Sequence, residues 1–165
     1  MESNLTVAEI FKVANLLPSG PVIWGTDPPE TNAGVYVIAR VDNEKGGCNA
    51  CALSFQDMCG IELDLEYERH RWLPNEPIVY IGKTDRPIRK RLSEFRRHKC
   101  GNKSPHAGGQ VVKLLQCELW VYWSPAANPY DAEHTMICAF KKQTGQLPFA
   151  NEYEGRGRRR VRHLD

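Results

Sequence analysis

The sequence predicts an α/β (α+β) domain with a small mixed or antiparallel, three-stranded central sheet flanked by helices. Three apolar runs rich in β-branched and aromatic residues support this prediction, because such residues favour strands. The runs are residues 35–41, 78–81 and 114–123. Two further segments repeat apolar residues at helical spacing, one from Ile88 and one over Asp131–Lys142. We expect a single domain over residues 1–152, because a chain of 165 residues is ordinary for one hydrophobic core.

The N-terminal residues, 1–32, predict a short helix and an irregular connection to the first strand. The helix covers residues 1–17. Thr6 can cap its start, and Glu9 lies three residues further on, which is the spacing of a capping box. Apolar residues then share one face that packs on the core: Val7, Ile10, Phe11, Ala14 and Leu17. Residues 21–33 include the run Asp-Pro-Pro-Glu, which favours an irregular connection.

A long insertion, residues 42–76, separates the first two predicted core strands. It contains Cys48, Cys51, Cys59 and His70, and thiolates with an imidazole suit the tetrahedral shell of a structural zinc ion. No second cysteine accompanies Cys59, so the usual paired knuckle is missing. Free thiols are therefore the favoured interpretation, with structural zinc as the alternative.

Targeting and membrane signals are missing from the sequence, which predicts a cytoplasmic protein. The first residues, MESNLTVAEIF, include an early acid and no basic region before an apolar core, so we expect no secretory signal. No apolar run approaches the ~20 residues of a membrane span, so we expect no membrane partner. In the cytosol the six cysteines are expected to be free or metal-bound rather than paired in disulfides.

Basic residues gather in two segments, although the net charge is only +2. Residues 86–103 carry eight of them against one acid, Glu94. They are Arg86, Arg89, Lys90, Arg91, Arg96, Arg97, Lys99 and Lys103. Residues 153–165 are expected to form a flexible tail with Arg156, Arg158, Arg159, Arg160 and Arg162. This uneven distribution suits one face for phosphate groups, but taken alone it favours the interpretation of a solvated basic helix.

Two tripeptides that contain a tyrosine lie in the first two predicted strands. The first reads Gly34-Val35-Tyr36 and the second reads Tyr80-Ile81-Gly82, after which a helix carries several arginines. This order resembles the GIY-YIG nuclease family. Further residues follow in the order of that family: Arg91, Glu133, Pro148 and Asn151. The resemblance covers about residues 33–152 and implies a fold of GIY-YIG type.

Two features depart from the usual pattern of the family. The two tyrosines are 44 positions apart, whereas members of the family usually join these strands by a short hairpin. Many members carry a histidine four residues after the arginine, where this chain has Phe95, and His98 lies seven residues after Arg91. Because aligning Arg91 needs a one-residue slip, Arg89 is an alternative ligand of the phosphate.

The resemblance implies a Mg²⁺-dependent (or Mn²⁺-dependent) DNA endonuclease, a hydrolase of phosphodiester bonds. Glu133 is then the metal ligand, since Mg²⁺ prefers hard oxygen ligands and often takes a single carboxylate from the protein. By the same resemblance Tyr36 is the candidate general base, Tyr80 positions the water or the phosphate, and Arg91 binds the scissile phosphate. A phenol is a poor base at neutral pH unless a neighbour helps, and Lys83 is one such neighbour.

Other residues are expected to support this chemistry or to contact DNA. Asn151 is expected to hold the pocket together by hydrogen bonds. The expected DNA-binding residues are Arg89, Lys90, Arg96, Arg97, His98, Arg158, Arg159 and Arg160. The substrate class covers a restriction site, branched or damaged DNA, and a mobile-element target. Two other functions stay open: a nucleic-acid-binding protein that kept the fold without the chemistry, and a zinc-stabilised interaction module. Glu133 argues against the first, because a binding protein has no need of it.

Overall fold

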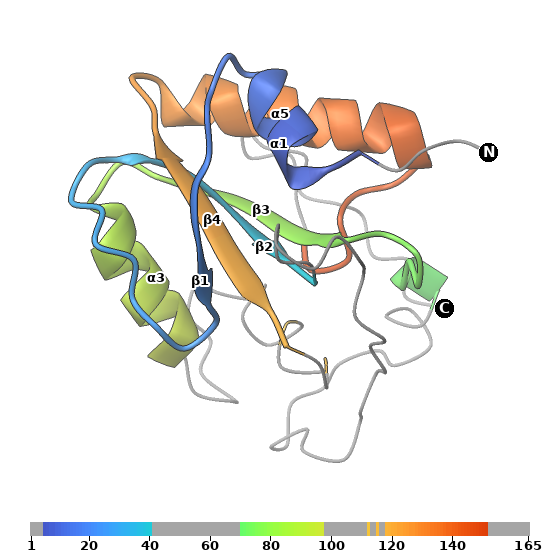
Figure 1. The fold of residues 1–165 in the computed structure, drawn as a ribbon. Helices are drawn as coiled ribbons and strands as arrows, with labels where there is room; N and C mark the ends of the chain where they lie inside the picture. The colour runs from blue at the N-terminus through green and yellow to red at the C-terminus, as the bar shows by residue number, and fades with distance from the viewer. Residues whose placement is uncertain (1–4, 41–69, 98–111, 113–114, 116–117, 152–165) are drawn as a thin grey trace, which may run out of the picture.

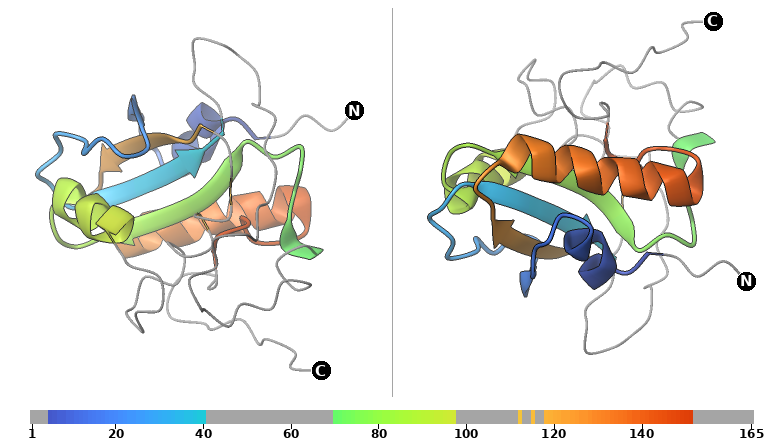
Figure 2. Two further views of the ribbon diagram at one scale, coloured as in Figure 1. Left: turned by 90° about the horizontal axis from the view of Figure 1, so that it is seen from below. Right: turned by 90° about the horizontal axis from the view of Figure 1, so that it is seen from above.

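The computed structural model describes residues 5–40, 70–97, 112, 115 and 118–151. The strands are β1 (Ser19–Ile23), β2 (Gly34–Ala39), β3 (Ile78–Thr84) and β4 (Trp120–Pro125). They form one antiparallel sheet in the order β1-β4-β2-β3. The helices are α1 (Val7–Lys12), α3 (Ile88–Arg97) and α5 (Pro129–Thr144). Figures 1 and 2 show α1 and α5 on one face of the sheet and α3 on the other, so the predicted mixed α/β class is confirmed.

The sheet has four strands in the described residues, where the sequence predicts three. The additional strand is β1. Its last residues overlap the start of residues 21–33, which the sequence predicted to be irregular. It is an edge strand that pairs only with β4, and its register shifts between Ser19 and Val22, the stretch that contains Gly20 and Pro21. An edge strand tolerates a proline because the missing N–H can face away from the neighbouring strand. The sequence therefore did not predict β1, because Gly20 and Pro21 are residues typical of turns.

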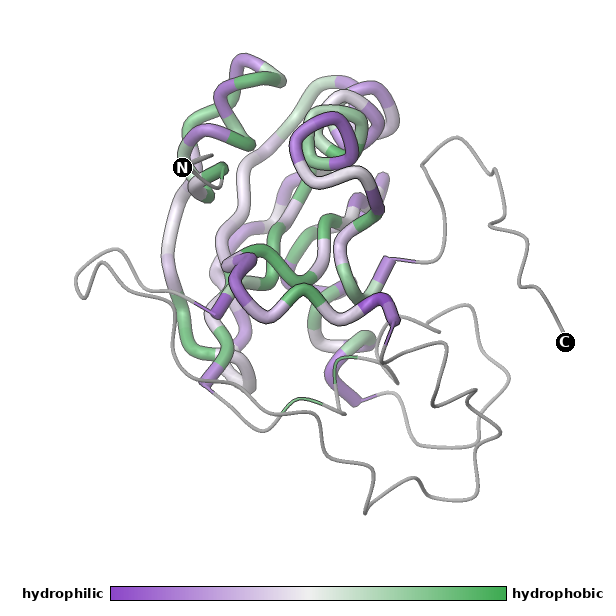
Figure 3. Tube along the Cα trace, turned by 90° about the vertical axis from the view of Figure 1, so that its right-hand side faces the viewer, coloured by the Kyte–Doolittle hydropathy of each residue, from purple (hydrophilic) through white to green (hydrophobic). Residues whose placement is uncertain are grey.

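The sheet separates two hydrophobic clusters, and β2 contributes to both. Tyr36 and Ile38 belong to the cluster under α3. Val35, Val37 and Ala39 alternate with them and belong to the cluster under α1 and α5. All six residues of β2 are buried, because helices cover both faces of this central strand. The tube in Figure 3 shows the hydrophobic strand segments lying between the helices.

The N-terminal helix α1 is shorter than the sequence predicts. The predicted capping box is confirmed: Glu9 N donates to Thr6 Oγ1 over 3.1 Å, and Thr6 N donates to Glu9 Oε2 over 2.8 Å. The helix ends at Lys12, and Asn15 adopts a left-handed conformation with φ of 57°. Leu17 therefore leaves the predicted apolar face and is 87% exposed.

The other predicted elements are present with shifted ends. Helix α3 begins at Ile88 as predicted and buries its apolar face, and α5 extends the predicted helix by two residues at each end. Strand β3 continues past Gly82 to Thr84, and β4 continues to Pro125, because both strands pair with Gly34 of β2 at those positions. None of the helices in the described ranges combines the length and the hydrophobicity that crossing a membrane requires.

Candidate active site

Two tyrosines on neighbouring strands meet on the α3 side of the sheet. Tyr36 lies opposite Gly82 in the β2–β3 ladder, and Tyr80 lies opposite Ile38. The two phenol rings are 6.0 Å apart between centroids. The ring of Phe95 from α3 is 5.2 Å from Tyr80 and 6.5 Å from Tyr36, so the three rings form one aromatic cluster. The sheet register therefore brings together two residues that are 44 positions apart in the chain.

The two glycines of the tripeptides are required by close packing. A Cβ atom on Gly82 would lie 2.5 Å from Tyr36 Cζ and 2.6 Å from Tyr80 Cε1, well inside van der Waals contact. A Cβ atom on Gly34 would overlap the carbonyl oxygen of Ser124 on β4. Gly82 thus makes room for both phenol rings, whereas Gly34 lets β2 and β4 approach each other.

Arg91 points to the same cluster from α3. It follows Ile88 by three residues and precedes Phe95 by four, so it shares their side of the helix. Burial raises the pKa of the Tyr36 phenol, and the Arg91 guanidinium opposes this rise more strongly than any other group. Arg91 also lowers the pKa values of Tyr80 and Glu133. Arg89, the alternative phosphate ligand, is exposed on the outer side of the helix.

Glu133 supplies a carboxylate from the buried side of α5. The residue is only 8% exposed, and burial raises the pKa of its carboxyl group to about 7, against the opposing effects of Lys83 and then Arg91. The charge of Glu133 in turn raises the pKa values of both tyrosines. Lys83 extends over α5, where its Nζ atom lies 3.5 Å from the centroid of the Tyr130 ring.

Both tyrosine hydroxyls are neutral phenols at neutral pH. Burial raises the pKa of Tyr36. The pKa of Tyr80 is raised well above its ordinary value, chiefly by burial and next by the charge of Tyr36. Tyr36 Oη is fully buried and meets no partner with hydrogen-bond geometry in the described part of the chain. Arg91 and Tyr80 nevertheless lie close enough to affect its pKa. The site therefore contains a buried phenol oxygen within reach of the Arg91 and Tyr80 side chains.

Asn151 holds the strand that carries this site. Its Nδ2 atom donates to the carbonyl oxygen of Ile81 over 2.8 Å, and its Oδ1 atom accepts from Ile81 N over 3.0 Å. Ala150 N donates to the carbonyl oxygen of Val79 over 2.9 Å. These bonds pair the outer edge of β3 between the tyrosine and the glycine of the second tripeptide. Asn151 thus contacts β3 through the backbone of Ile81.

Two residues contribute to the site that sequence reasoning missed. Arg71 is buried, and its Nη2 atom donates to the carbonyl oxygens of Pro148 over 2.8 Å and of Asn151 over 2.6 Å. It fixes the loop that presents Asn151, but its partners are 77 and 80 positions away, so no local pattern reveals it. The second missed residue is Tyr130, whose contact with Lys83 joins α5 to β3. In the sequence, its position about one turn before Glu133 was the only sign of this role.

The basic residues of α3 divide into paired and exposed groups. Arg96 lies 3.2 Å from an Asp27 carboxylate oxygen and also donates to the carbonyl oxygen of Gly25. It therefore ties the β1–β2 connection to α3, although the sequence suggested a DNA contact. Exposed basic side chains are Arg89, Lys90 and Arg97. The other predicted DNA-binding residues, His98, Arg158, Arg159 and Arg160, lie outside the described residues.

The predicted zinc ligands do not form a cluster that the structure describes. Cys48, Cys51 and Cys59 lie outside the described residues, and His70 is exposed. Within the described ranges, no group of three or more His, Cys, Asp or Glu side chains is arranged to hold a metal ion.

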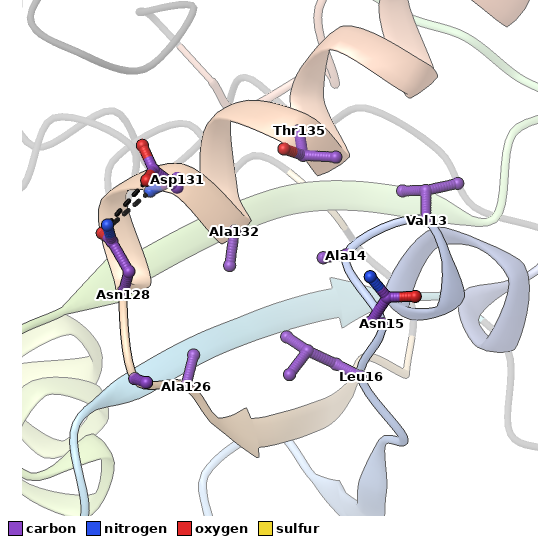
Figure 4. A pocket seen from close by; sticks show the side chains of 10 residues that line it. Val13, Ala14, Asn15, Leu16, Ala126, Asn128, Asp131, Ala132 and Thr135 are labelled. Carbon is purple, nitrogen blue, oxygen red and sulfur yellow. Dashed lines mark hydrogen bonds between the residues drawn. The ribbon is translucent and has the colours of Figure 1, made fainter.

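A groove lies apart from the tyrosines, between the end of α1 and the start of α5 (Figure 4). It has a volume of about 380 Å³. Its lining is Val13, Ala14, Asn15, Leu16, Ala126, Ala127, Asn128, Asp131, Ala132 and Thr135. The polar groups at its rim cap α5: Asn128 Nδ2 donates to Asp131 Oδ2, and Asp131 N donates to Asn128 Oδ1. None of the predicted site residues lines this groove.

Comparisons with known proteins found no matching family model, no matching curated protein and no matching solved structure.

Proposed function

We propose that the protein is a divalent-metal-dependent DNA endonuclease of GIY-YIG type. What carries the proposal is the electrostatic coupling of one buried carboxylate, Glu133, with two phenols, a guanidinium and an ammonium group. Hydrolysis of a phosphodiester requires a water that loses a proton and groups that stabilise negative charge on the phosphate. This set of side chains contains both kinds of group.

The residues fit one divalent cation bound through a single carboxylate. Glu133 is a hard oxygen ligand, and the Tyr36 hydroxyl is a buried oxygen without a hydrogen-bond partner among the described residues. A cation bound there would stabilise the charge on the phosphate and the leaving oxygen, and would lower the pKa values of the adjacent phenols. Magnesium and manganese are the expected ions, because oxygen donors suit both.

The side chains of the protein have separate roles in this proposal. Arg91 binds the non-bridging oxygens of the scissile phosphate, because its planar fork of donors matches their spacing. Tyr36 orients the attacking water through its hydroxyl oxygen. Because burial raises the pKa of this phenol, it accepts a proton only when nearby positive charge, including that of Arg91, lowers that pKa. Tyr80 positions the water or the phosphate beside it. Lys83 favours the ionised form of Glu133.

The exposed side of α3 offers the nearest surface for the rest of the DNA. Arg89, Lys90 and Arg97 are exposed there, on the same helix that presents Arg91 to the site. Contacts of this kind bind the phosphate backbone and fix the orientation of the duplex without reading its sequence. The proposal therefore assigns phosphate binding to α3 and leaves sequence recognition to other parts of the chain.

The test is cleavage of supercoiled plasmid and of a panel of branched DNAs, with Mg²⁺ or with EDTA. The variants are Glu133→Gln and a matched control, Glu118→Gln, which changes an exposed carboxylate. We expect Mg²⁺-dependent cleavage by the wild type and by the control, and a loss of cleavage in Glu133→Gln. Discrete plasmid fragments would indicate sequence-specific cutting, whereas nicking of branched substrates alone would indicate a repair or recombination substrate.

Binding measured in parallel separates the enzyme from its alternative. If the wild type binds DNA but cuts none of these substrates, and Glu133→Gln leaves the affinity unchanged, the endonuclease proposal is wrong. The protein is then a nucleic-acid-binding protein on the same fold.

A further inference from the structure

We infer that Tyr130 is a positioning residue of the proposed nuclease site, whose ring holds the Lys83 ammonium so that it does not close onto the Glu133 carboxylate. The Lys83 Nζ atom lies 3.5 Å from the centroid of the Tyr130 ring. Tyr130 precedes Glu133 by three residues on α5, so the two side chains share one side of the helix. The inference rests on the proposed function, because that proposal assigns Glu133 to a divalent cation.

Packing in the core does not explain a tyrosine at this position. Tyr130 is 50% exposed, and the buried residues of α5 begin only at Glu133. The turn that carries Tyr130 is nevertheless fixed, because Asn128 caps α5 by accepting from Asp131 N over 3.2 Å. The ring is therefore presented to Lys83 from a well-defined backbone, and its contact with the ammonium is the contact that the structure gives it.

Lys83 reaches the ring from the sheet. Its neighbours in β3, Gly82 and Thr84, are buried, so its backbone is fixed, whereas its stem is flexible and can place the ammonium in several positions. Lys83 opposes the raised pKa of Glu133 more strongly than any other group, which places its charge near that carboxylate. Within the described residues, however, the ammonium forms no ion pair with Glu133 or with any other carboxylate. The ring therefore determines where the ammonium stays.

This position of the ammonium matters for the proposed cation. An ammonium paired with Glu133 would occupy the same carboxylate oxygens that a divalent cation needs as ligands. Attraction to the face of the Tyr130 ring holds the ammonium near Glu133 and leaves those oxygens open. The strength of such contacts at exposed sites corresponds to a factor of about two to five in an equilibrium constant, so loss of the ring is expected to weaken cation binding by about that factor.

The first test locates the Lys83 ammonium in the full chain without metal, by nuclear magnetic resonance. Protons above the face of an aromatic ring resonate upfield of their ordinary position, and the Lys83 signals are identified by their loss in Lys83→Met. We expect upfield ε-methylene and ammonium protons in the wild type and in Tyr130→Phe, which keeps the ring, and ordinary positions in Tyr130→Leu. Ordinary positions in the wild type, or an upfield shift that persists in Tyr130→Leu, would overturn the inference.

The second test is titration of the full chain with Mn²⁺, followed by the electron paramagnetic resonance signal of the free ion. We expect Tyr130→Leu to bind Mn²⁺ about two- to fivefold more weakly than the wild type and Tyr130→Phe to match the wild type. In a Lys83→Met background, Tyr130→Leu is expected to have no effect, because no ammonium remains to compete. Equal losses in both backgrounds, or no loss in the presence of Lys83, would contradict the inference. If the wild type binds no Mn²⁺ through Glu133, the proposed metal site is wrong, and the resonance comparison alone decides whether Tyr130 positions Lys83.

Discussion

The raised pKa of Glu133 predicts how the free energy of unfolding changes with pH. Its pKa rises from an ordinary 4.5 to about 7 in the folded chain, chiefly through burial. The folded state therefore holds this proton more tightly than the unfolded state. Stability contributed by the protonated group is fully present below about pH 4.5 and is lost as the pH rises through 7. Because one pKa unit corresponds to about 1.36 kcal/mol, the loss amounts to about 3 kcal/mol at pH 8.

Replacing Glu133 with glutamine removes this pH dependence, because glutamine keeps the shape of the protonated acid and does not ionise. We expect Glu133→Gln to be more stable than the wild type by about 3 kcal/mol at pH 8, and by only about 1 kcal/mol at pH 5. The measurement is urea denaturation at both pH values in EDTA, analysed with a common slope. Glu118→Gln, which changes an exposed carboxylate, is expected to match the wild type at both.

Two results would refute this reasoning. An equal difference at pH 5 and pH 8 would mean that Glu133 does not titrate between them. A variant less stable than the wild type at pH 8 would mean that Lys83 and Arg91 stabilise the ionised carboxylate more than burial destabilises it. Addition of Mg²⁺ at pH 8 gives an independent comparison: an ion that binds the folded chain at Glu133 stabilises the wild type and leaves Glu133→Gln unchanged.

Three further predictions concern the framework of the site and its basic helix. Gly82→Ala places a Cβ atom against both phenol rings, and we expect a loss of about 1–3 kcal/mol in urea denaturation. Asn151→Ala leaves the Ile81 N–H and C=O without their side-chain partners, so we expect a loss of about 1–3 kcal/mol and faster hydrogen exchange at Ile81. Arg89→Ala is expected to reduce the slope of log affinity for DNA against log salt by about 0.9, whereas Arg96→Ala is expected to lower the melting temperature without changing that slope. An unchanged slope in Arg89→Ala would remove Arg89 from the DNA interface.

Local patterns in the sequence predicted the elements around the site, and long-range contacts explain what they did not predict. The strand before Gly82, the helix from Ile88 and the helix around Glu133 follow from runs of apolar residues at regular spacing. Strand β1 (Ser19–Ile23) was not predicted, because an edge strand that pairs on one side needs few apolar residues and accepts Gly-Pro. The role of Arg71 depends on carbonyl groups far along the chain, so only the folded structure reveals it.

The residues at the centre of the site share a physical property that the fold alone does not explain. Phe95 shows that an aromatic ring without a hydroxyl packs well in this cluster, yet Tyr36 buries a hydroxyl that no described residue satisfies. Glu133 likewise places an ionisable group where burial raises its pKa to about 7, although a neutral side chain would be more stable there at that pH. Groups with perturbed pKa values gather where function requires them, and Arg91 lowers the pKa values of both of these groups, which come from separate elements. The proposed cation would supply positive charge to Glu133 and a polar contact to Tyr36, and its binding would therefore relieve both penalties.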